Sequence, residues 1–449
     1  MSQPERTNHH LTREEIAQRE VGHTSVTPAV SRFLVFSFLL VIVAVPVANH
    51  VAEGWRQAVA GGEVRPTTLT LFDGFPALDE VLQMSKEGPV DAVFEVNRRV
   101  LAAITSWESA LRKTSATSQA LLPAAQNLIS GYLGGGNEKA YCGADGWFFY
   151  RPEIEYLTGP GFLEPRALLD RLRAAKDGRT AVQPDPTKAI LEFNRFLARQ
   201  GIRLVVMPVP IKPVIYPERF ANRALHKAPP LQNASFGDFK ARLEAAGIAV
   251  LDLAPSLVEE KKRGANVYLA TATHWTPAGA RVAALWLAAL IRSSVPLPAG
   301  RTVDYRKRVA RVSNVGDTAR MIGLPVSETV EIEQVLSADG QPWAASPQAQ
   351  ILCLGDSFSN IDSLRGMGWG ESAGLVEHLS AELGQPIDAI VVNDNGAFAT
   401  REQLSLAEGG AGDRLKNKKL VVYEFTMREL TTGDWKLGLH AGAFAGPSS

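Results

Sequence analysis

The sequence contains little cysteine and no excess of charge of either sign. Its two cysteines, Cys142 and Cys353, do not have the spacing of a zinc site. Cys353 lies in the apolar run 351–354, so we expect a small buried core residue and no disulfide. Basic and acidic residues both number 47 among 449. This balance gives no electrostatic reason to expect a nucleic-acid partner, and the sequence indicates no metal or other cofactor.

One long apolar run interrupts this ordinary composition near the N-terminus. Residues 33–48 read FLVFSFLLVIVAVPVA, without a charge and with Ser37 as the one polar side chain. The run is slightly short for a membrane span, but the following residues can extend it at the interface. We therefore predict a transmembrane helix over 33–51. A cleaved signal peptide is the alternative, and the 32 mostly polar residues before the run are too long for its n-region.

The arginines that flank this run predict its orientation. Four precede it and two follow closely, namely Arg6, Arg13, Arg19 and Arg32 before it and Arg56 and Arg65 after it. The positive-inside rule then places the polar leader 1–32 in the cytoplasm and the rest of the chain outside a bacterial inner membrane, in the periplasm. We expect an uncleaved signal anchor and a disordered leader.

The exported part divides into three segments of different composition. Residues 52–140 are predicted to be a helical stalk or subdomain, with helices over 90–113 and 118–133. Three glycines at 134–136 end the helical pattern. Residues 141–440 are predicted to be the functional domain, and 441–449 a tail. No repeat of 20–50 residues is present.

The functional domain alternates helical segments with short apolar runs. Predicted helices cover 187–200, 236–246 and 277–292, and predicted buried strands cover 202–207, 248–252, 351–354, 390–392 and 420–423. This alternation favours an α/β fold with a mostly parallel sheet flanked by helices on both faces. In such sheets the functional site lies at the carboxyl ends of the strands.

A serine and a histidine stand in positions suited to acyl chemistry. Ser357 follows an apolar strand in CLGDSFSN, where a tight turn exposes the hydroxyl and directs backbone N–H groups at a developing oxyanion. His274 lies in YLATATHWTPAGA, just before a helix that Thr276 caps and Pro277 opens. A general base can act from such a junction. Each motif alone is also compatible with an ordinary turn or a helix-capping histidine.

Two further groups are weaker candidates for the site. Asn395 and Gly396 follow a strand in VVNDNGAF, where they are candidate oxyanion-hole donors or a simple Asx turn. Trp147, Trp275 and Trp369 are candidates for a sugar-stacking platform, although core packing is the more usual role of tryptophan.

In combination these strings resemble one family. THWTPAGA followed by GDSFS is similar to the SGNH-hydrolase-like domain of the alginate O-acetylation proteins AlgJ and AlgX. GADGWFFY at 143–150, PVPIK with YPE at 208–218, and YEF with REL at 423–430 resemble further motifs of that family. The resemblance covers about 141–440. The single anchor and the helical stalk fit the AlgJ type.

The resemblance implies a serine nucleophile, a histidine base and an aspartate two residues before the histidine. Ser357 and His274 match, but position 272 is alanine where the family reads D-T-H-W. A triad aspartate orients the imidazole and stabilises its cation. Three interpretations follow: an inactivated variant of an enzyme, another acid such as Asp252 beside His274, or a weak dyad or binding module. The intact surrounding string favours the first.

The function implied by the resemblance is O-acetylation of a secreted polysaccharide through an acetyl-serine. The implied partner is a membrane-bound O-acyltransferase that supplies acetyl groups across the inner membrane. A carbohydrate acetylesterase is the alternative among enzymes, with water instead of a sugar hydroxyl as acceptor. A non-catalytic polysaccharide-binding subunit of an acetylation complex is the alternative outside enzymes, and Ala272 supports it.

Overall fold

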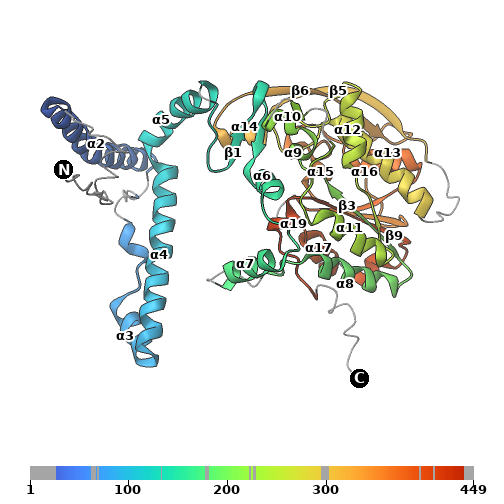
Figure 1. Ribbon diagram of the computed structural model, residues 1–449, viewed down its shortest axis with the longest axis horizontal. Helices are drawn as coiled ribbons and strands as arrows, with labels where there is room; N and C mark the ends of the chain where they lie inside the picture. The colour runs from blue at the N-terminus through green and yellow to red at the C-terminus, as the bar shows by residue number, and fades with distance from the viewer. Residues whose placement is uncertain are drawn as a thin grey trace, which may run out of the picture. The chain divides into compact units, whose positions relative to one another are not determined.

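The computed structural model (Figure 1) divides into two compact units, Met1–Ala125 and Gln126–Ser449. It describes residues 27–61, 67, 70–132, 134–176, 182–221, 224–225, 229–294, 303–393, 396–407 and 410–438. Residues 1–26, which make up most of the predicted polar leader, lie outside the described residues, as does the predicted tail 441–449.

The first unit contains the predicted membrane span within one long helix. Helix α2, Pro28–Val59, includes an 18-residue window of mean hydropathy 2.4 of which no part is buried. Thr27 caps its start by accepting a hydrogen bond from Val30 N at 3.4 Å. A single apolar helix near the N-terminus is compatible with the predicted single-pass anchor, and a signal sequence has the same features.

The rest of the first unit is helical, as predicted from the sequence. Its elements are η2 (Leu71–Gly74), α3 (Leu78–Glu87), α4 (Pro89–Thr114) and α5 (Ala116–Gln126), and a π-helical segment η3 (Asn127–Tyr132) follows α5. Helix α4 corresponds to the helix predicted over 90–113 and has Pro89 at its first position. The helix predicted over 118–133 is instead divided between α5 and η3, where the helical repeat widens before the glycines.

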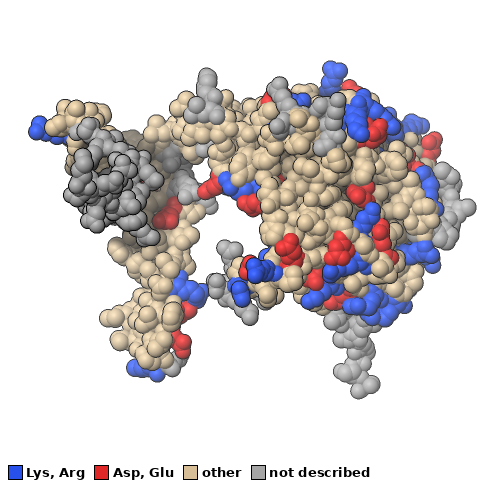
Figure 2. All heavy atoms as spheres, viewed as in Figure 1, with Lys and Arg blue, Asp and Glu red and all other residues tan. Residues whose placement is uncertain are grey.

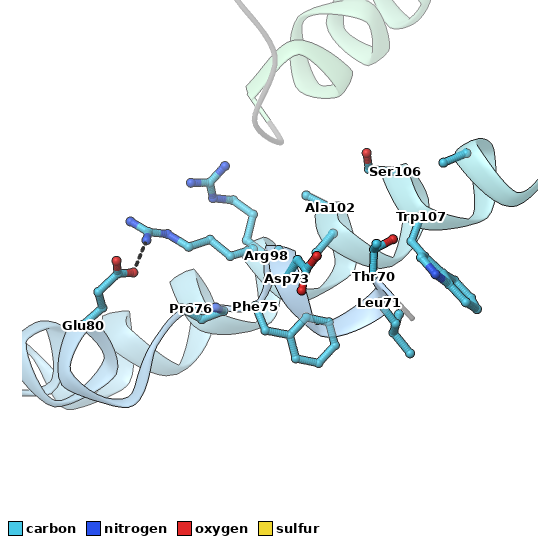
Figure 3. Close-up of a pocket in the computed structure, with 14 residues that line it drawn as sticks. Thr70, Leu71, Asp73, Phe75, Pro76, Glu80, Arg98, Ala102, Ser106 and Trp107 are labelled. Carbon is cyan, nitrogen blue, oxygen red and sulfur yellow. Dashed lines mark hydrogen bonds and ion pairs between the residues drawn. The ribbon is translucent and has the colours of Figure 1, made fainter. Parts of the chain in front are cut away.

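A hollow of about 550 Å³ lies within the first unit between η2 and α4 (Figure 3). Both arginines of its lining are paired, because Arg99 Nη1 lies 3.2 Å from Glu80 Oε2 and Arg98 Nη2 lies 2.7 Å from Glu95 Oε1. Trp107 Nε1 at its end donates to Thr67 O at 2.8 Å. The Arg99 and Trp107 contacts therefore join α4 to α3 and to Thr67.

The second unit is built on a five-stranded parallel sheet with the order β4-β3-β9-β7-β8. Its strands are β3 (Arg203–Val209), β4 (Ala249–Val250), β7 (Ile351–Gly355), β8 (Asp388–Val391) and β9 (Leu420–Thr426). Each strand predicted from an apolar run is present in this sheet. The α/β class and the mostly parallel sheet are therefore confirmed.

Helices cover both faces of this sheet. On one face lie α12 (Ala254–Lys262), α13 (Pro277–Ser294) and α16 (Leu375–Leu383), and on the other lie α8 (Pro186–Ala198), α11 (Phe236–Ala245) and α17 (Ala399–Leu406) (Figure 1). The connections β3 to β4 and β7 to β8 run toward opposite edges of the sheet. Right-handed crossovers then require their helices, α11 and α16, to lie on opposite faces.

Shorter elements complete the second unit. They are β1 (Ala140–Cys142), β2 (Phe148–Tyr150), α6 (Arg151–Thr158), α7 (Pro165–Lys176), α9 (Lys212–Ile215), α10 (Pro217–Phe220), α15 (Ser357–Asn360), α18 (Gly410–Leu415), α19 (Glu429–Thr432) and the 3-10 turns η4 (Ala144–Gly146) and η6 (Arg365–Met367). Strands β1 and β2 pair antiparallel, with Tyr141 opposite Phe149. On the face that Figure 2 presents, basic and acidic side chains are interspersed over this unit.

An antiparallel ribbon was not predicted from the sequence. Strands β5 (Arg306–Val315) and β6 (Ser327–Leu336) pair along their full length, and the short helix α14 (Asp317–Ile322) lies in their connection. Strand β5 is mostly exposed and rich in basic residues, so it lacks the apolar run of a buried strand. The alternation of charged and apolar residues in β6 is typical of a half-buried strand.

The core surrounds the central strands. Strands β7 and β9 are buried along their whole length, which explains their mostly apolar sequences, and Glu424 and Thr426 are the buried polar residues of β9. Cys353 is fully buried in β7 and is a free thiol, as predicted. Trp147, Trp275 and Trp369 are 6%, 0% and 2% exposed. The sugar-stacking hypothesis for these three residues is therefore wrong, and they pack in the core.

Candidate active site

A pocket of about 260 Å³ lies at the carboxyl ends of the central strands, where open α/β sheets place their sites. Ser357 follows β7, Asn393 follows β8 and Arg428 follows β9, and a loop before α13 adds His274. The full lining is Tyr150, Thr273, His274, Asp317, Met321, Ser357, Met367, Asn393 and Arg428. Segments that are distant in sequence thus meet around one hydroxyl group.

The turn that carries Ser357 is fixed by two acidic side chains. Asp356 accepts hydrogen bonds from Phe358 N and Thr426 N, both at 2.8 Å, and so joins the start of α15 to the end of β9. Glu424 Oε2 accepts from Asp356 N at 2.8 Å and from Ser359 Oγ at 2.7 Å. Gly355 is required here, since a Cβ at this position would lie 2.4 Å from Ser359 Oγ.

His274 faces this serine directly. Its Nε2 lies 2.9 Å from Ser357 Oγ, although 83 positions separate the two residues. This distance confirms the predicted pairing of the two residues, and both are largely buried, at 6% and 7% exposure. The geometry suits transfer of the hydroxyl proton to the imidazole.

The loop before α13 is held from both sides. The buried Lys212 Nζ donates to Phe148 O at 2.7 Å and to Ala270 O at 3.2 Å. From the ribbon, Glu328 accepts from Ala270 N at 3.2 Å and from Thr271 N at 3.1 Å. Burial lowers the pKa of Lys212 to about 8, against the charges of nearby carboxylates. The position of the imidazole is thus set by both the parallel sheet and the ribbon.

The Nδ1 side of the imidazole faces a threonine and a carboxylate. Thr273 Oγ1 lies 3.0 Å from His274 Nδ1 and donates to Asp317 Oδ2 at 2.6 Å. Asp317 Oδ2 lies 3.6 Å from His274 Nδ1. Asp317 is the first residue of α14, so this acid comes from the ribbon and not from the histidine loop.

The two positions considered from the sequence for the acid have other surroundings in the structure. Ala272 is 1% exposed and belongs to the apolar core of the sheet. Asp252 lies before α12, where its Oδ1 accepts from Ala254 N at 3.3 Å. Of the three interpretations of the alanine, the geometry favours a second acid, with Asp317 in place of Asp252.

The electrostatic environment keeps the imidazole neutral and Asp317 ionised. Burial lowers the pKa of His274 below its ordinary value, and the negative charge of Asp317 opposes this shift. Burial would raise the pKa of Asp317, but His274 and the hydrogen bonds from Thr273 hold it below its ordinary range. A neutral imidazole is the form that accepts a proton from serine.

Asn393 is the described residue that lines the pocket at the β8 end. Asn395 lies outside the described residues, and Gly396 is in the left-handed region with φ +77, close to Glu429. Asn393 lines the pocket, and its Oδ1 accepts from Asn360 Nδ2 at 2.9 Å. This bond assigns the oxygen of the amide and leaves Nδ2 as the end that can donate.

Arg428 brings positive charge to the same pocket. Its Nη1 lies 3.3 Å from Glu153 Oε1, and its guanidinium is 6.0 Å from the ring centroid of Phe358. Burial raises the pKa of Glu153 to about 7, although Arg428 and Lys212 oppose this shift. The arginine therefore faces a carboxyl group whose charge changes near neutral pH.

The comparison with known families identifies this domain. A family model described as "SGNH hydrolase-like domain, acetyltransferase AlgX" matches residues 141–427, which is more than half of the chain. The chain belongs to this AlgX family. The resemblance inferred from the sequence motifs is thereby confirmed.

Several relatives of this AlgX-family chain are described as probable alginate O-acetylases AlgJ. The protein from Pseudomonas aeruginosa is 31% identical over 268 residues, which cover 55% of this chain and 66% of the relative. The protein from Azotobacter vinelandii is 33% identical over 201 residues, or 42% of this chain and 49% of the relative. The chain thus spans less than two thirds of the curated relatives it matches.

The chain is also similar to two solved structures. The O-acetyltransferase domain of Pseudomonas putida AlgJ is 21% identical, with a TM-score of 0.48 over 65% of this chain and 92% of that one. Pseudomonas aeruginosa AlgX is 18% identical, with a TM-score of 0.46 over 65% and 62% of the two chains.

Proposed function

We propose that this chain is an O-acetyltransferase that acetylates a secreted polysaccharide through an acetyl group on Ser357. The observation that supports it best is the 2.9 Å contact between Ser357 Oγ and His274 Nε2 at the carboxyl ends of the strands. Membership of an acetyltransferase family and the alginate O-acetylase relatives agree with this function.

The first half of the reaction forms the acetyl-serine. Ser357 Oγ attacks the acetyl carbonyl of the donor while its proton moves to His274 Nε2. Asn393 Nδ2 donates to the oxygen that becomes negative in the tetrahedral intermediate. The bond from the acetyl carbon to the donor then breaks, and the proton on His274 passes to the leaving group.

The second half transfers the acetyl group to the polymer. A sugar hydroxyl attacks the acetyl carbonyl and gives its proton to His274. The Ser357 ester bond breaks, and Ser357 Oγ recovers the proton. An acetylesterase would use water in this step, so the two enzymes differ in acceptor alone.

We place the site in the periplasm of a bacterium, with the chain held in the inner membrane by α2. The uncharged run 33–48 in α2 and Arg32 on its N-terminal side support this orientation. The acetyl donor is then delivered from the cytoplasmic side by a membrane-bound O-acyltransferase partner.

The test uses the full-length protein in liposomes with a small acetyl ester and a neutral or acidic oligosaccharide acceptor. We expect mass spectrometry to find an acetyl group on Ser357 and on the acceptor. Ser357→Ala abolishes both, and the exposed Ser293→Ala on α13 leaves both unchanged. Ester hydrolysis with no acetylated acceptor would show an esterase. Retention of the oligosaccharide with no acetyl-serine would show a binding subunit.

A further inference from the structure

We infer that Asp317, acting through the hydroxyl group of Thr273, orients His274 and replaces the aspartate expected at position 272. This inference rests on the proposed function. It makes Asp317 and Thr273 positioning residues, since neither is required to touch the acetyl group.

The hydrogen-bond geometry assigns the proton on each atom of this chain of contacts. The hydroxyl of Thr273 has one proton and two neighbours, Asp317 Oδ2 at 2.6 Å and His274 Nδ1 at 3.0 Å. An ionised carboxylate accepts and never donates. Thr273 therefore gives its proton to Asp317 and must accept from His274, so Nδ1 carries a hydrogen.

The hydrogen on Nδ1 determines the protonation of the other ring nitrogen, Nε2. A neutral imidazole with its hydrogen on Nδ1 has a free lone pair on Nε2. That nitrogen is the one 2.9 Å from Ser357 Oγ, where a general base must accept. The carboxylate thus selects the reactive tautomer through one intervening hydroxyl group, as a triad aspartate does by direct contact.

Asp317 also matters for charge, because the imidazole becomes a cation when Ser357 reacts. Asp317 and Asp356 favour that cation, whereas Arg428 and Lys212 disfavour it. Asp317 Oδ2 lies 3.6 Å from the ring nitrogen. Its removal leaves two cations near the imidazole and a single carboxylate that is already engaged with backbone N–H groups.

The carboxylate is held firmly in place by the backbone of both segments. Asp317 Oδ1 accepts from Thr273 N and from Thr318 N, both at 2.7 Å. Gly316 allows this approach, since a Cβ there would lie 2.0 Å from Thr271 O. The β5–β6 connection and the histidine loop therefore form one unit. The imidazole has its partner although position 272 is alanine.

The same contacts predict what an amide at position 317 does. In Asp317→Asn the side-chain carbonyl oxygen must continue to accept from Thr273 N and Thr318 N, as Oδ1 does in the wild type. The NH₂ group therefore takes the place of Oδ2. That group donates to Thr273, whose hydroxyl then donates to Nδ1. The hydrogen moves to Nε2, which is the tautomer that cannot accept from Ser357.

The first measurement is independent of activity. The full-length protein in detergent micelles is labelled with ¹⁵N-histidine, and the His274 signals are assigned by their loss in His274→Gln. We expect the Nδ1–H tautomer in the wild type and in Thr273→Ser, and the Nε2–H tautomer in Asp317→Asn. The matched control Asp252→Asn, at an acid bonded elsewhere, keeps the wild-type signals. Unchanged His274 signals in Asp317→Asn would overturn the inference.

The second measurement is the pH profile of acetyl-ester turnover. We expect Asp317→Asn to lower kcat by about 10²-fold or more, by comparison with the roughly 10⁴-fold effect at a directly bonded triad aspartate. The acid limb of the profile moves to lower pH, because the imidazole loses its nearest anion. Thr273→Val lowers kcat and Thr273→Ser restores it. If the acid limb of Asp317→Asn has the same pH midpoint as that of the wild type, the inference is contradicted. An inactive wild type with the Nδ1–H tautomer would contradict the proposed function alone.

Discussion

The ring of Phe358 packs against the imidazole of His274, with 4.8 Å between the ring centroids and 43° between the planes. The residue that follows Ser357, the proposed nucleophile, thus supports the imidazole of the proposed base. Phe358 is fully buried and also meets the edge of Trp275, at 5.1 Å between centroids. Helix α15 therefore carries Ser357 and also packs against the imidazole of His274.

Replacing Phe358 by leucine should separate positioning from stability. We expect Phe358→Leu to lower kcat by about 10-fold with a small change in KM, because the imidazole loses its lateral support. The matched control is Phe239→Leu, which removes an equally buried ring in the same core away from the pocket. Thermal midpoints should fall in both variants. Equal kcat values in the two variants would count against a positioning role for Phe358.

The pH dependence of acylation should follow His274. The imidazole must be neutral to accept the proton from Ser357, so activity is present above its pKa and is lost as the pH falls through it. Burial lowers this pKa. We therefore expect the acid limb of kcat/KM to have its midpoint below the ordinary histidine value of about 6.5. The measurement is the initial rate of acetyl-ester cleavage between pH 4 and 9, and a midpoint above 7 would disagree with the buried environment.

Gly316→Ala should damage the contact between the ribbon and the histidine loop. The added Cβ would lie 2.0 Å from the carbonyl oxygen of Thr271 and 2.6 Å from Ala272 N, and backbone atoms cannot move aside cheaply. We expect a loss of about 2 kcal/mol of stability, with reduced activity. In the control Gly237→Ala, the exposed helical site has open space and the variant should be as stable as the wild type or slightly more so. Denaturant unfolding of both variants measures the difference.

Ala272→Asp should not raise activity. The side chain at 272 is buried in the apolar core, and Asp317 already occupies the Nδ1 side of the imidazole. A carboxylate at 272 would be desolvated near a second acid, so we expect a lower thermal midpoint and unchanged or reduced turnover. Ala174→Asp, at an exposed site in α7, serves as the control for the change of charge. An increase in turnover would restore position 272 as the missing triad site.

Glu153 should make stability depend on pH in a defined direction. Its pKa is raised by burial from 4.5 to about 7. Below pH 4.5 the group is protonated in both the folded and the unfolded chain. As the pH rises toward 7 the unfolded chain loses the proton first, so the folded state is progressively destabilised, by about 3 kcal/mol in all.

The variant Glu153→Gln removes this titration. The unfolding free energy of the variant minus that of the wild type should therefore increase between pH 4.5 and 7.5. This increase is expected whether the variant is more or less stable than the wild type at pH 4.5. Unfolding midpoints at the two pH values give this difference directly. A constant difference across the range would mean that Glu153 stays ionised beside Arg428.

The strands and the serine–histidine pair could be predicted because their signals are local. An uninterrupted apolar run such as 351–354 indicates a strand that is buried on both faces, and the residue after it then lies at the carboxyl edge of the sheet. Thr276 and Pro277 mark the start of α13 in the same way, and Thr276 Oγ1 accepts from Gly279 N at 3.3 Å. The two motifs therefore predicted that Ser357 follows a buried strand and that His274 lies just before α13, as the structure shows.

The acid and the asparagine could not be predicted in this way. Asp317 reaches His274 because the β5–β6 ribbon packs on the histidine loop. Strand β5 is mostly exposed and polar, so its sequence has no periodic pattern of apolar residues that would predict this contact. Asn393 lines the pocket two positions before the predicted Asn395, which lies outside the described residues, and the turn pattern alone does not indicate Asn393. The hydrogen bond from Asn360, which orients the amide, comes from a segment 33 positions away.

The histidine loop is joined to the β5–β6 ribbon by hydrogen bonds from Ala270, Thr271 and Thr273, while Ser357 opens α15 just after strand β7 of the parallel sheet. The proposed nucleophile and the proposed positioning acid therefore belong to different parts of the fold. Insertions or substitutions in the outer part of the ribbon would therefore change proton transfer from a distance. A ligand-responsive module grafted there would strengthen or weaken the hydrogen bonds that position the imidazole, and the turn that carries Ser357 would keep its own contacts.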